Sequence, residues 1–428
     1  MSDDQMPGFN TLSIHAGAQP DPATGARATP IYQTTSFVFD DIDHAASLFA
    51  LETFGNVYSR LTNPTTAVLE ERVAALEDAT AALAVASGHA AQNIVFHTLL
   101  EPGDAFIAGR QLYGGSVNQF NHAFKKYDWE VIWADASKPE SFEKAMTDKV
   151  KAIFIESLAN PGGIVMDIEA IAKVAKKAGV PLIVDNTLAT PYLCQPKKHG
   201  ADIIVHSLTK FLGGQGNSLG GMVVDCGTFD WLSSGKYAAL SSPCESYHGI
   251  RFAETFGDFA FAIACRFQGL RDLGPCISPF NAFLILNGIE TLSLRMQRHC
   301  DNALAVAEWL DAHPKVHWVN YAGLKKNPYA KLAKKYVPKG SGALFTFGLK
   351  GGFEAGVSLV SNVELFSHLA NIGDTRSLII HPASTTHAQL TSEERTLAGA
   401  GDDVVRLSIG IEDSQDIIAD LEQALEDI

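Results

Sequence analysis

The sequence predicts an α/β protein: a large domain with a mostly parallel sheet, followed by a smaller α+β domain. From about residue 63 to 225, segments with helical periodicity alternate with short apolar runs. Such alternation is typical of a parallel sheet covered by helices on both faces. After this region come a long helical pattern and further strand-like runs. The length of 428 residues also exceeds one ordinary core, which favours two domains.

Seven short apolar runs predict the strands of the main sheet. They lie at 81–86, 105–108, 130–134, 152–156, 181–184, 203–205 and 221–224. The helices predicted in this region lie at 65–76, 90–100 and 168–178. The last is amphipathic and ends in Lys176, Lys177 and Gly179, which suit the final turn of a helix and the position after it.

The remaining segments divide the chain into three parts. Residues 1–60 lack periodicity and are rich in Gly, Pro and Thr, so we expect an arm that wraps another surface. Residues 226–275 are less regular, 281–310 read as long and helical, and 342–349 and 404–408 read as strands. The predicted division is an N-terminal arm over 1–62, a large domain over 63–280 and a C-terminal α+β domain over 281–428.

Composition argues against several classes of protein. The formal charge of −15 disfavours nucleic-acid binding. No apolar stretch is long enough for a membrane span, and the acidic N-terminus does not resemble a signal peptide. The six cysteines are far apart without a C-x-x-C pair, so neither a metal site nor a disulfide framework is indicated. We expect a cytoplasmic protein with reduced, buried thiols.

Lys210 is the most informative residue. It comes after the apolar run 203–205 and two hydroxyl residues, and a turn with two glycines follows it. A solvated charge at a strand end is one interpretation. The other is chemical, because a lysine amine in apolar or cationic surroundings loses its proton readily and forms Schiff bases with aldehydes. Ser207 and Thr209, spaced two residues apart as on one strand face, can both donate to one phosphate.

Two other strand ends carry polar groups. Ser87, Gly88 and His89 follow one strand and open a helix, a geometry that presents backbone N–H groups to an anion. Asp185 ends the run 181–184 at the edge where open α/β sheets bind ligands. An aspartate that caps the following turn is the alternative for Asp185.

Two further segments are expected near this edge. Glu156 and Asn160 end another strand. Tyr113 precedes Gly114 and Gly115, so it is either a hairpin tip or an aromatic ring stacked on a flat ligand. The set matches the needs of pyridoxal phosphate, which takes a lysine for its aldehyde and an acid for its ring nitrogen. The turn at Gly88 would serve its phosphate and Tyr113 its ring.

Eight motifs resemble the pyridoxal-phosphate enzymes of cysteine and methionine metabolism, the cystathionine γ-lyase group. They are Tyr58-Ser59-Arg60, Ser87-Gly88-His89-Ala90, Tyr113-Gly114-Gly115, Asn160-Pro161, Asp185-Asn186-Thr187, Ser207-Leu208-Thr209-Lys210, the segment 381–387 and Arg406-Leu407-Ser408-Ile409-Gly410. The stretch 235–298 is similar to the sulfhydrylase branch, and Gly115 replaces a cysteine found in methionine γ-lyases. His89 and Leu208 depart from the commoner pattern.

This resemblance implies fold-type I and a set of residue roles. The implied catalytic residues are Lys210, Tyr113 and Asp185. The implied cofactor ligands are Ser87, Gly88, His89, Ser207 and Thr209 at the phosphate, Asn160 at the 3-oxygen, and Tyr58 and Arg60 from a neighbouring subunit. The substrate carboxylate would bind Arg406, Ser377 and Asn160, and Arg376 would help choose the substrate or form a surface salt bridge.

The resemblance also implies an activity and an assembly. The implied reaction is γ-replacement, in which O-acetylhomoserine and sulfide or methanethiol give homocysteine or methionine. The alternatives are use of O-succinylhomoserine, cystathionine γ-synthase or a methionine or cystathionine γ-lyase. A non-catalytic regulator that binds pyridoxal phosphate is a more distant alternative. The implied assembly is a homotetramer built from two dimers.

Overall fold

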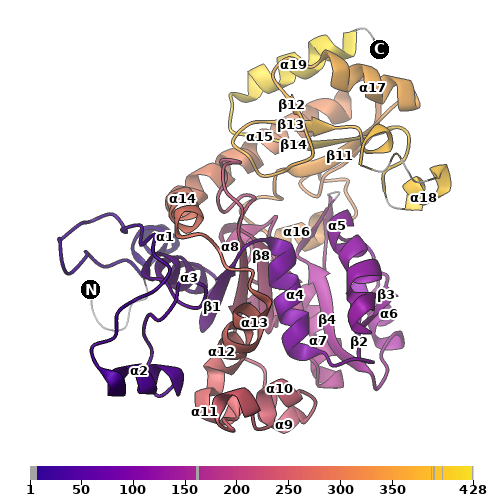
Figure 1. Cartoon of the computed structure of the whole chain (residues 1–428). Helices are drawn as coiled ribbons and strands as arrows, with labels where there is room; N and C mark the ends of the chain where they lie inside the picture. The colour runs from indigo at the N-terminus through magenta and orange to yellow at the C-terminus, as the bar shows by residue number, and fades with distance from the viewer. Residues whose placement is uncertain (1–6, 161–162, 387, 389–390, 398, 427) are drawn as a thin grey trace.

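Two sheets with their covering helices form the body of the molecule, and an extended N-terminal segment lies at its side (Figure 1). The computed structural model describes residues 7–160, 163–386, 388, 391–397, 399–426 and 428. Pro161 and His387, which belong to the motifs quoted above, and Gly162 lie outside these residues. Among the described residues, no helix combines the length and apolar character needed to cross a membrane.

The larger sheet has seven strands, as predicted. They are β1 (Ala81–Val85), β2 (Ala105–Gly109), β3 (Glu130–Ala134), β4 (Val150–Glu156), β7 (Leu182–Asp185), β8 (Ile203–Ser207) and β9 (Gly221–Asp225), in the order β1-β9-β8-β7-β4-β2-β3. Pairing is parallel from β3 to β8, whereas β9 runs antiparallel to both β8 and β1. The predicted mostly parallel sheet is therefore confirmed.

Helices cover both faces of this sheet because alternate strand residues point to opposite sides. On one face, Ile107 and Ile153 pack in a core with α3 (Pro64–Leu76) and α7 (Ile168–Ala178). On the other face, Phe106 and Phe154 pack in a second core with α4 (Gly88–Leu99). This layering leaves the carboxyl ends of the parallel strands as the free edge of the sheet.

The smaller sheet has five strands in the order β10-β11-β14-β13-β12. They are β10 (Val316–Asn320), β11 (Leu344–Leu349), β12 (Ser367–His368), β13 (Leu378–Ile380) and β14 (Val404–Ser408). Helices α15 (Leu292–Ala312), α17 (Gly352–Asn362) and α19 (Ser414–Glu426) accompany it (Figure 1). Only β11 and β14 were predicted, because the other three strands are short or carry too little apolar alternation.

The prediction that 281–310 is long and helical is confirmed, but the segment is broken at Thr291 into two helices. The segment forms α14 (Pro279–Glu290), which contacts α3, and then α15, which contacts β10 and α19. The break is stabilised by Arg295, whose Nη2 donates to the carbonyl oxygen of Gly288 (2.6 Å). The two helices therefore join the two parts of the molecule, and the predicted domain boundary at 280 stays a prediction.

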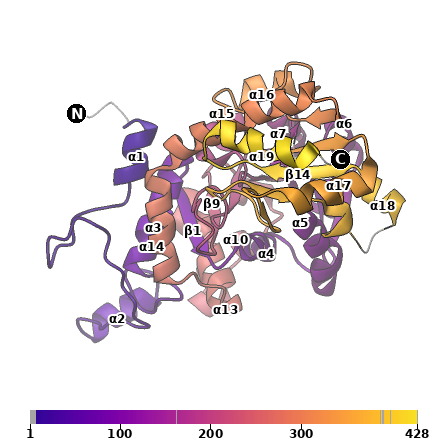
Figure 2. The same ribbon diagram turned by 90° about the horizontal axis from the view of Figure 1, so that it is seen from above.

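The N-terminal segment contains α1 (Phe9–His15) and α2 (Ile42–Phe49) joined by extended chain. Seen from above, it projects from the body beside α3 and α14 (Figure 2). Several of its apolar side chains face solvent, including Val38 (96% exposed) and Ile42 (86% exposed). Large exposed apolar groups of this kind mark an interaction surface when they gather in one region.

Candidate active site

A cavity of about 270 Å³ lies at the carboxyl edge of the larger sheet and is closed on its far side by residues of the smaller domain. It lies where the topology of open α/β sheets predicts a ligand site. Ten of the residues predicted to bind cofactor or substrate line it: Ser87, Gly88, His89, Tyr113, Asn160, Asp185, Ser207, Thr209, Lys210 and Arg406.

Lys210 lies in the turn that follows β8, and its side chain enters the cavity. The amine Nζ donates to Oδ1 of Asn371 at 2.5 Å. Burial and the nearby Arg406 guanidinium lower the pKa of Lys210 to about 8. A solvated strand-end charge would not show this shift. At neutral pH a useful fraction of the amine is therefore unprotonated and nucleophilic.

Ser207 and Thr209 do not share one strand as expected, because β8 ends at Ser207 and Thr209 lies in the following turn. Both still line the cavity. The hydroxyl of Thr209 donates to the carbonyl of Gly220 (3.2 Å) and accepts from its N–H (3.1 Å). These two bonds fix the turn that presents Lys210.

Glu156 and Asp185 lie side by side, because they are partners in the parallel register of β4 and β7. The Glu156 oxygens accept from the N–H groups of Tyr113 (2.7 Å) and Asn160 (2.9 Å). Asp185 accepts from the Thr187 N–H (3.0 Å) and from Gln92 Nε2 (3.5 Å). It therefore both caps a turn and lines the cavity.

The two carboxyl groups differ in their proton affinity. Burial, reinforced by the charge of Asp185, raises the pKa of Glu156 well above its ordinary value. Burial also raises the pKa of Asp185, but hydrogen bonds from Thr187 oppose that rise. Glu156 is thus the better holder of a proton, which leaves Asp185 as the carboxylate that faces the cavity.

The turn at Gly88 forms the anion-binding end. The Ser87 hydroxyl caps α4 by accepting from the N–H of Ala90 (3.2 Å). A Cβ on Gly88 would lie 2.9 Å from the Cβ of Ser207, so only glycine permits this approach of the helix start to β8. The free N–H groups and dipole of a helix start favour a bound anion here.

Tyr113 precedes α5 (Gly114–Asn118), so it begins a helix and is not a hairpin tip. Its ring is 46% exposed and stacks beside the imidazole of His89, with centroids 5.9 Å apart. A Cβ on Gly115 would lie 2.3 Å from this ring. The glycine therefore keeps one side of the ring clear, while the ring lines the cavity.

Arg406 belongs to β14 and enters the cavity from the smaller domain. Its guanidinium donates to Oδ1 of Asn160 (3.3 Å) and to the carbonyl of Asn371 (3.5 Å). Burial lowers the pKa of Arg406, but an arginine starts so high that it stays charged. A partly buried cation that donates to neutral acceptors at long distances can bind a carboxylate.

Four predicted residues do not line this cavity. The Ser377 hydroxyl donates to Glu412 (3.0 Å) and accepts from the Gly410 N–H (2.9 Å). Arg376 is exposed and pairs with Asp374 at 3.1 Å. The guanidinium of Arg60 lies 5.5 Å from the centre of the Tyr58 ring and donates to the carbonyl of Arg271. The Ser377 hydroxyl is therefore already used in stabilising the chain around Gly410 and Glu412. Arg376 forms a surface salt bridge, which was the alternative to a role in choosing the substrate.

Three polar residues of the cavity that the sequence analysis does not name are Gln92, Ser116 and Asn371. Gln92 follows Gly88 by one helical turn, so its position on the same helix face could have been read from the sequence. Its Nε2 donates to Ser116 (3.0 Å), and its Oε1 is buried without a hydrogen-bond partner. Asn371 lies in a loop of the smaller domain far along the chain, and no local pattern announces it.

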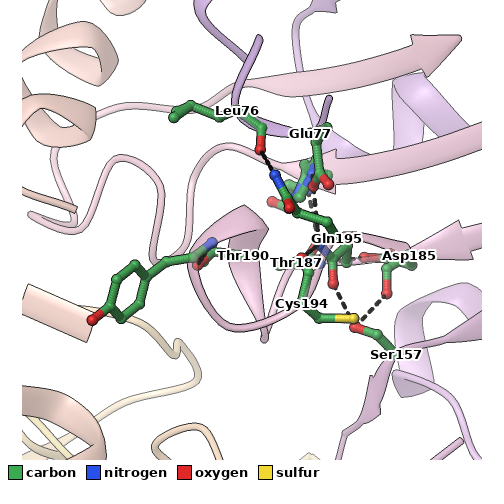
Figure 3. Close-up of polar contacts among 12 residues, drawn as sticks. Leu76, Glu77, Ser157, Asp185, Thr187, Thr190, Cys194 and Gln195 are labelled. Atoms are coloured by element: carbon green, nitrogen blue, oxygen red, sulfur yellow. Dashed lines mark hydrogen bonds and ion pairs between the residues drawn. The ribbon is translucent and has the colours of Figure 1, made fainter. Parts of the chain in front are cut away.

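A buried polar layer supports Asp185 from behind (Figure 3). The hydroxyl of Ser157 donates to Asn186 Oδ1 (2.8 Å), and Asn186 Nδ2 donates to Glu77 (2.9 Å). The imidazole Nε2 of His206 lies 2.7 Å from the same Glu77 oxygen. Because these groups are hydrogen-bonded and largely inaccessible to solvent, they fix the turn after β7.

The donor set fits pyridoxal phosphate. The cavity offers an amine of lowered pKa, a partly buried carboxylate, an aromatic ring and a helix start that only glycine permits. Gln92, whose side-chain oxygen is buried without a hydrogen-bond partner, also lines the cavity. Each group answers one need of the cofactor, namely its aldehyde, ring nitrogen, ring face and phosphate.

Comparisons with known proteins agree with this chemistry. A relative from Leptospira meyeri, "O-acetyl-L-homoserine sulfhydrylase", is 53% identical over 98% of this chain and 96% of its own. "O-acetyl-L-homoserine sulfhydrylase 1" of Thermus thermophilus is 49% identical over 97% of this chain and 99% of its own. A solved candidate O-acetylhomoserine (thiol)-lyase of Campylobacter jejuni carries N′-pyridoxyl-lysine-5′-monophosphate. It is 42% identical, has a TM-score of 0.94, and covers 98% of this chain and 100% of its own.

A family model agrees over nearly the full length. Residues 10–426 match the model for Cys/Met metabolism PLP-dependent enzymes. The match includes every cavity residue named above, from Ser87 to Arg406. The chain belongs to the family of pyridoxal-phosphate-dependent enzymes of cysteine and methionine metabolism.

Proposed function

We propose that this protein catalyses γ-replacement on O-acetyl-L-homoserine. Hydrogen sulfide gives L-homocysteine and acetate, and methanethiol gives L-methionine and acetate. One Cγ–O bond breaks and one Cγ–S bond forms, so no oxidant or reductant is needed. The observation that carries the proposal is the pairing of an amine, Lys210, with a partly buried guanidinium, Arg406, across one cavity. The substrate is suggested by the names of the relatives.

The protein's residues divide the work of cofactor and substrate binding. When bound, pyridoxal phosphate supplies an electron sink for the carbon next to the substrate nitrogen. Lys210 would carry the cofactor between turnovers and move protons at the substrate. Asp185 would hold the ring nitrogen and Tyr113 would stack on the ring, with Asn160 near the 3-oxygen. The residues proposed for the phosphate are Ser87, Gly88, His89, Ser207 and Thr209.

The guanidinium of Arg406 would bind the substrate α-carboxylate. Its planar fork suits two parallel hydrogen bonds to a carboxylate, and Asn160 would add a third donor. Ser377 would help indirectly, because its hydroxyl binds Glu412 and Gly410 just beyond the end of β14. This arrangement would orient the Cα–H bond toward the Lys210 amine.

A two-substrate assay tests the proposal. Purified enzyme is given O-acetyl- or O-succinylhomoserine with sulfide, and homocysteine is measured beside ammonia and 2-oxobutyrate. We expect homocysteine from the acetyl ester, with the keto acid a minor product. Dominant 2-oxobutyrate would indicate a γ-lyase, and preference for the succinyl ester would reassign the substrate. Cofactor binding without consumption of either ester would indicate a regulator.

We also infer that the protein works as a homotetramer of two dimers in the cytoplasm. The exposed apolar side chains of the N-terminal segment support a subunit interface, as do Phe280 (52% exposed) and Leu294 (71% exposed) on α14 and α15. Tyr58, which is 41% exposed, and Arg60 lie on that segment and do not line their own chain's cavity, so they would be available to a neighbour's phosphate. The six unpaired cysteines suit a reducing compartment.

Mixed subunits test the shared site. Arg60→Ala should weaken cofactor retention about tenfold or more, because a hydrogen bond to a charged group contributes roughly 1.5–3 kcal/mol. Hybrids of Arg60→Ala with Lys210→Ala subunits should regain part of the activity, since one site in each dimer is then intact. Re-formed hybrids without activity would show that Arg60 serves only its own chain.

A further inference from the structure

A loop of the smaller domain is docked directly on the turn that carries Lys210. This loop, residues 369–376, connects β12 to β13. The Thr375 N–H donates to the carbonyl of Gly214 at 2.9 Å. Gly373 has a φ of +73°, and a Cβ there would lie 2.7 Å from the backbone nitrogen of Phe211. Loop and turn are thus in backbone contact, closer than any side chain at position 373 would allow.

The same loop is fastened to the end of β14, the strand that carries Arg406. The Gly373 N–H donates to the hydroxyl of Ser408 (3.0 Å), and the Ile411 N–H donates to the carbonyl of Thr375 (2.9 Å). The loop therefore fixes the distance between two segments that lie on different domains. It ties the lysine turn to the arginine strand.

Asn371 is the loop residue that contacts both cations of the cavity. Its side-chain Oδ1 accepts from the Lys210 amine at 2.5 Å, and its backbone carbonyl lies 3.5 Å from Nη2 of Arg406. It is neutral, so it can orient an amine without fixing a proton on it as a carboxylate would. The amide is the acceptor found for Lys210 among the described residues.

We propose that Asn371 is a positioning residue that holds the free amine of Lys210 in register with Arg406. It acts whenever the lysine is not bonded to the cofactor, which during turnover is when its amine must move the substrate's protons. Asn371 then sets the position of the amine that acts on the α-carbon relative to the guanidinium that binds the substrate carboxylate. This inference rests on the proposed function, because it assumes a substrate whose carboxylate binds Arg406.

A positioning role for Asn371 can be distinguished from a purely structural role by the pKa of Lys210. A hydrogen-bond acceptor favours the charged form of an amine, so removing it should lower the pKa of Lys210 and adding a negative charge should raise it. Arg406, Asp185, Glu156, Tyr113 and His89 are the other ionisable groups that line the cavity, and the substitutions leave them in place. A purely structural residue would change the melting temperature and not this pKa.

The first measurement uses cofactor-free protein. Competitive acetylation with an isotope-coded anhydride, followed by peptide mapping, gives the pKa and reactivity of Lys210 in wild type, Asn371→Ala and Asn371→Asp. We expect Asn371→Ala to lower the pKa by about one and Asn371→Asp to raise it by at least as much. The matched control is Asn362→Ala, an exposed asparagine at the end of α17 in the same domain. Any other pattern in folded protein overturns the proposal.

The second measurement uses the holoenzyme. With cofactor bound, Asn371→Ala should show about a tenfold fall in kcat for O-acetylhomoserine with KM changed less than about twofold, because the amine is misplaced and the carboxylate site is kept. Asn371→Asp is close to isosteric, so it remains informative if the alanine variant unfolds. If wild type does not consume the ester, the proposed substrate fails, whereas the opposite pKa changes would still stand. Unchanged kcat in both variants would overturn the positioning role.

Discussion

The two walls of the cavity are built on different principles. The wall from the larger domain consists of residues at the carboxyl ends of parallel strands and at the start of α4, such as Asp185, Lys210 and Gly88. Sheet topology alone brings such residues to one edge. The wall from the smaller domain consists of Arg406 in the middle of β14 and Asn371 in a loop. The topology of the larger sheet does not place these two residues. They reach the cavity because the loop 369–376 docks on the turn that carries Lys210.

This difference predicts a division of labour that mutation can test. Changes to the large-domain residues proposed to hold the cofactor should reduce cofactor binding. Changes in the small-domain wall should spare cofactor binding and alter substrate kinetics.

Lys210→Ala should have the largest effect. It removes both the covalent attachment of the cofactor and the general base, and a positioned base alone contributes about 10²–10⁴-fold to the rate. We expect kcat to fall by more than about 10³-fold and borohydride to trap no adduct on the variant. Lys173→Ala, which removes an exposed lysine from α7, is the control and should behave as wild type. An adduct that maps to another lysine would show that Lys210 is not the residue that binds the cofactor covalently.

Arg406→Lys tests the opposite wall. It keeps the charge but loses the planar two-donor fork, and misplacement of a substrate by about 1 Å can cost on the order of a hundredfold. We expect kcat/KM for O-acetylhomoserine to fall by about that factor while the absorbance of bound cofactor is unchanged. Melting curves and active-site titration on the same sample check the result. A lowered melting temperature with normal kcat/KM per folded site would make Arg406 a structural residue.

The contrast between the walls also explains what could be predicted from the sequence. The seven strands of the larger sheet and nine of the cavity residues were expected from local sequence signals, such as polar residues at the ends of apolar runs, whereas Arg406 was expected only from the resemblance. Asn371 carries no such signal, and its role exists only after the loop docks on the lysine turn. The break at Thr291 was missed because Arg295 closes α14 through a side chain rather than through a glycine or proline.

Ser377 shows the limit of carrying a role over from a motif. The resemblance predicted that its hydroxyl would reach the substrate carboxylate, yet that hydroxyl is buried against Glu412 and Gly410. A motif fixes a residue's place in the chain, but hydrogen-bond partners from elsewhere decide where its side chain points. The buried Glu156, which the sequence placed only at a strand end, proves to join Tyr113 and Asn160 through their backbone.

Asp185→Asn should weaken the binding of the cofactor more than the binding of the substrate. The amide cannot supply the negative charge that a protonated ring nitrogen requires, and a charge-assisted hydrogen bond contributes roughly 1.5–3 kcal/mol. We expect the dissociation constant for pyridoxal phosphate to rise about tenfold or more. Equilibrium dialysis with cofactor-free protein measures it, and the exposed Asp148→Asn serves as control. Unchanged cofactor affinity would break the assignment of cofactor binding to this wall.

Glu156→Gln should have the smallest effect and sharpens the comparison within one wall. Burial and Asp185 raise the pKa of Glu156 well above its usual range, which favours the neutral form whose charge glutamine matches. Glutamine offers one acceptor oxygen where Glu156 uses two, so the N–H of either Tyr113 or Asn160 loses its partner. An unsatisfied buried N–H costs about 1–3 kcal/mol. We therefore expect a lower melting temperature, a fall in kcat of only a few-fold, and cofactor affinity close to that of wild type. If the affinity instead falls as far as in Asp185→Asn, Glu156 carries a charge that the cofactor needs, and the two carboxyl groups act as one unit.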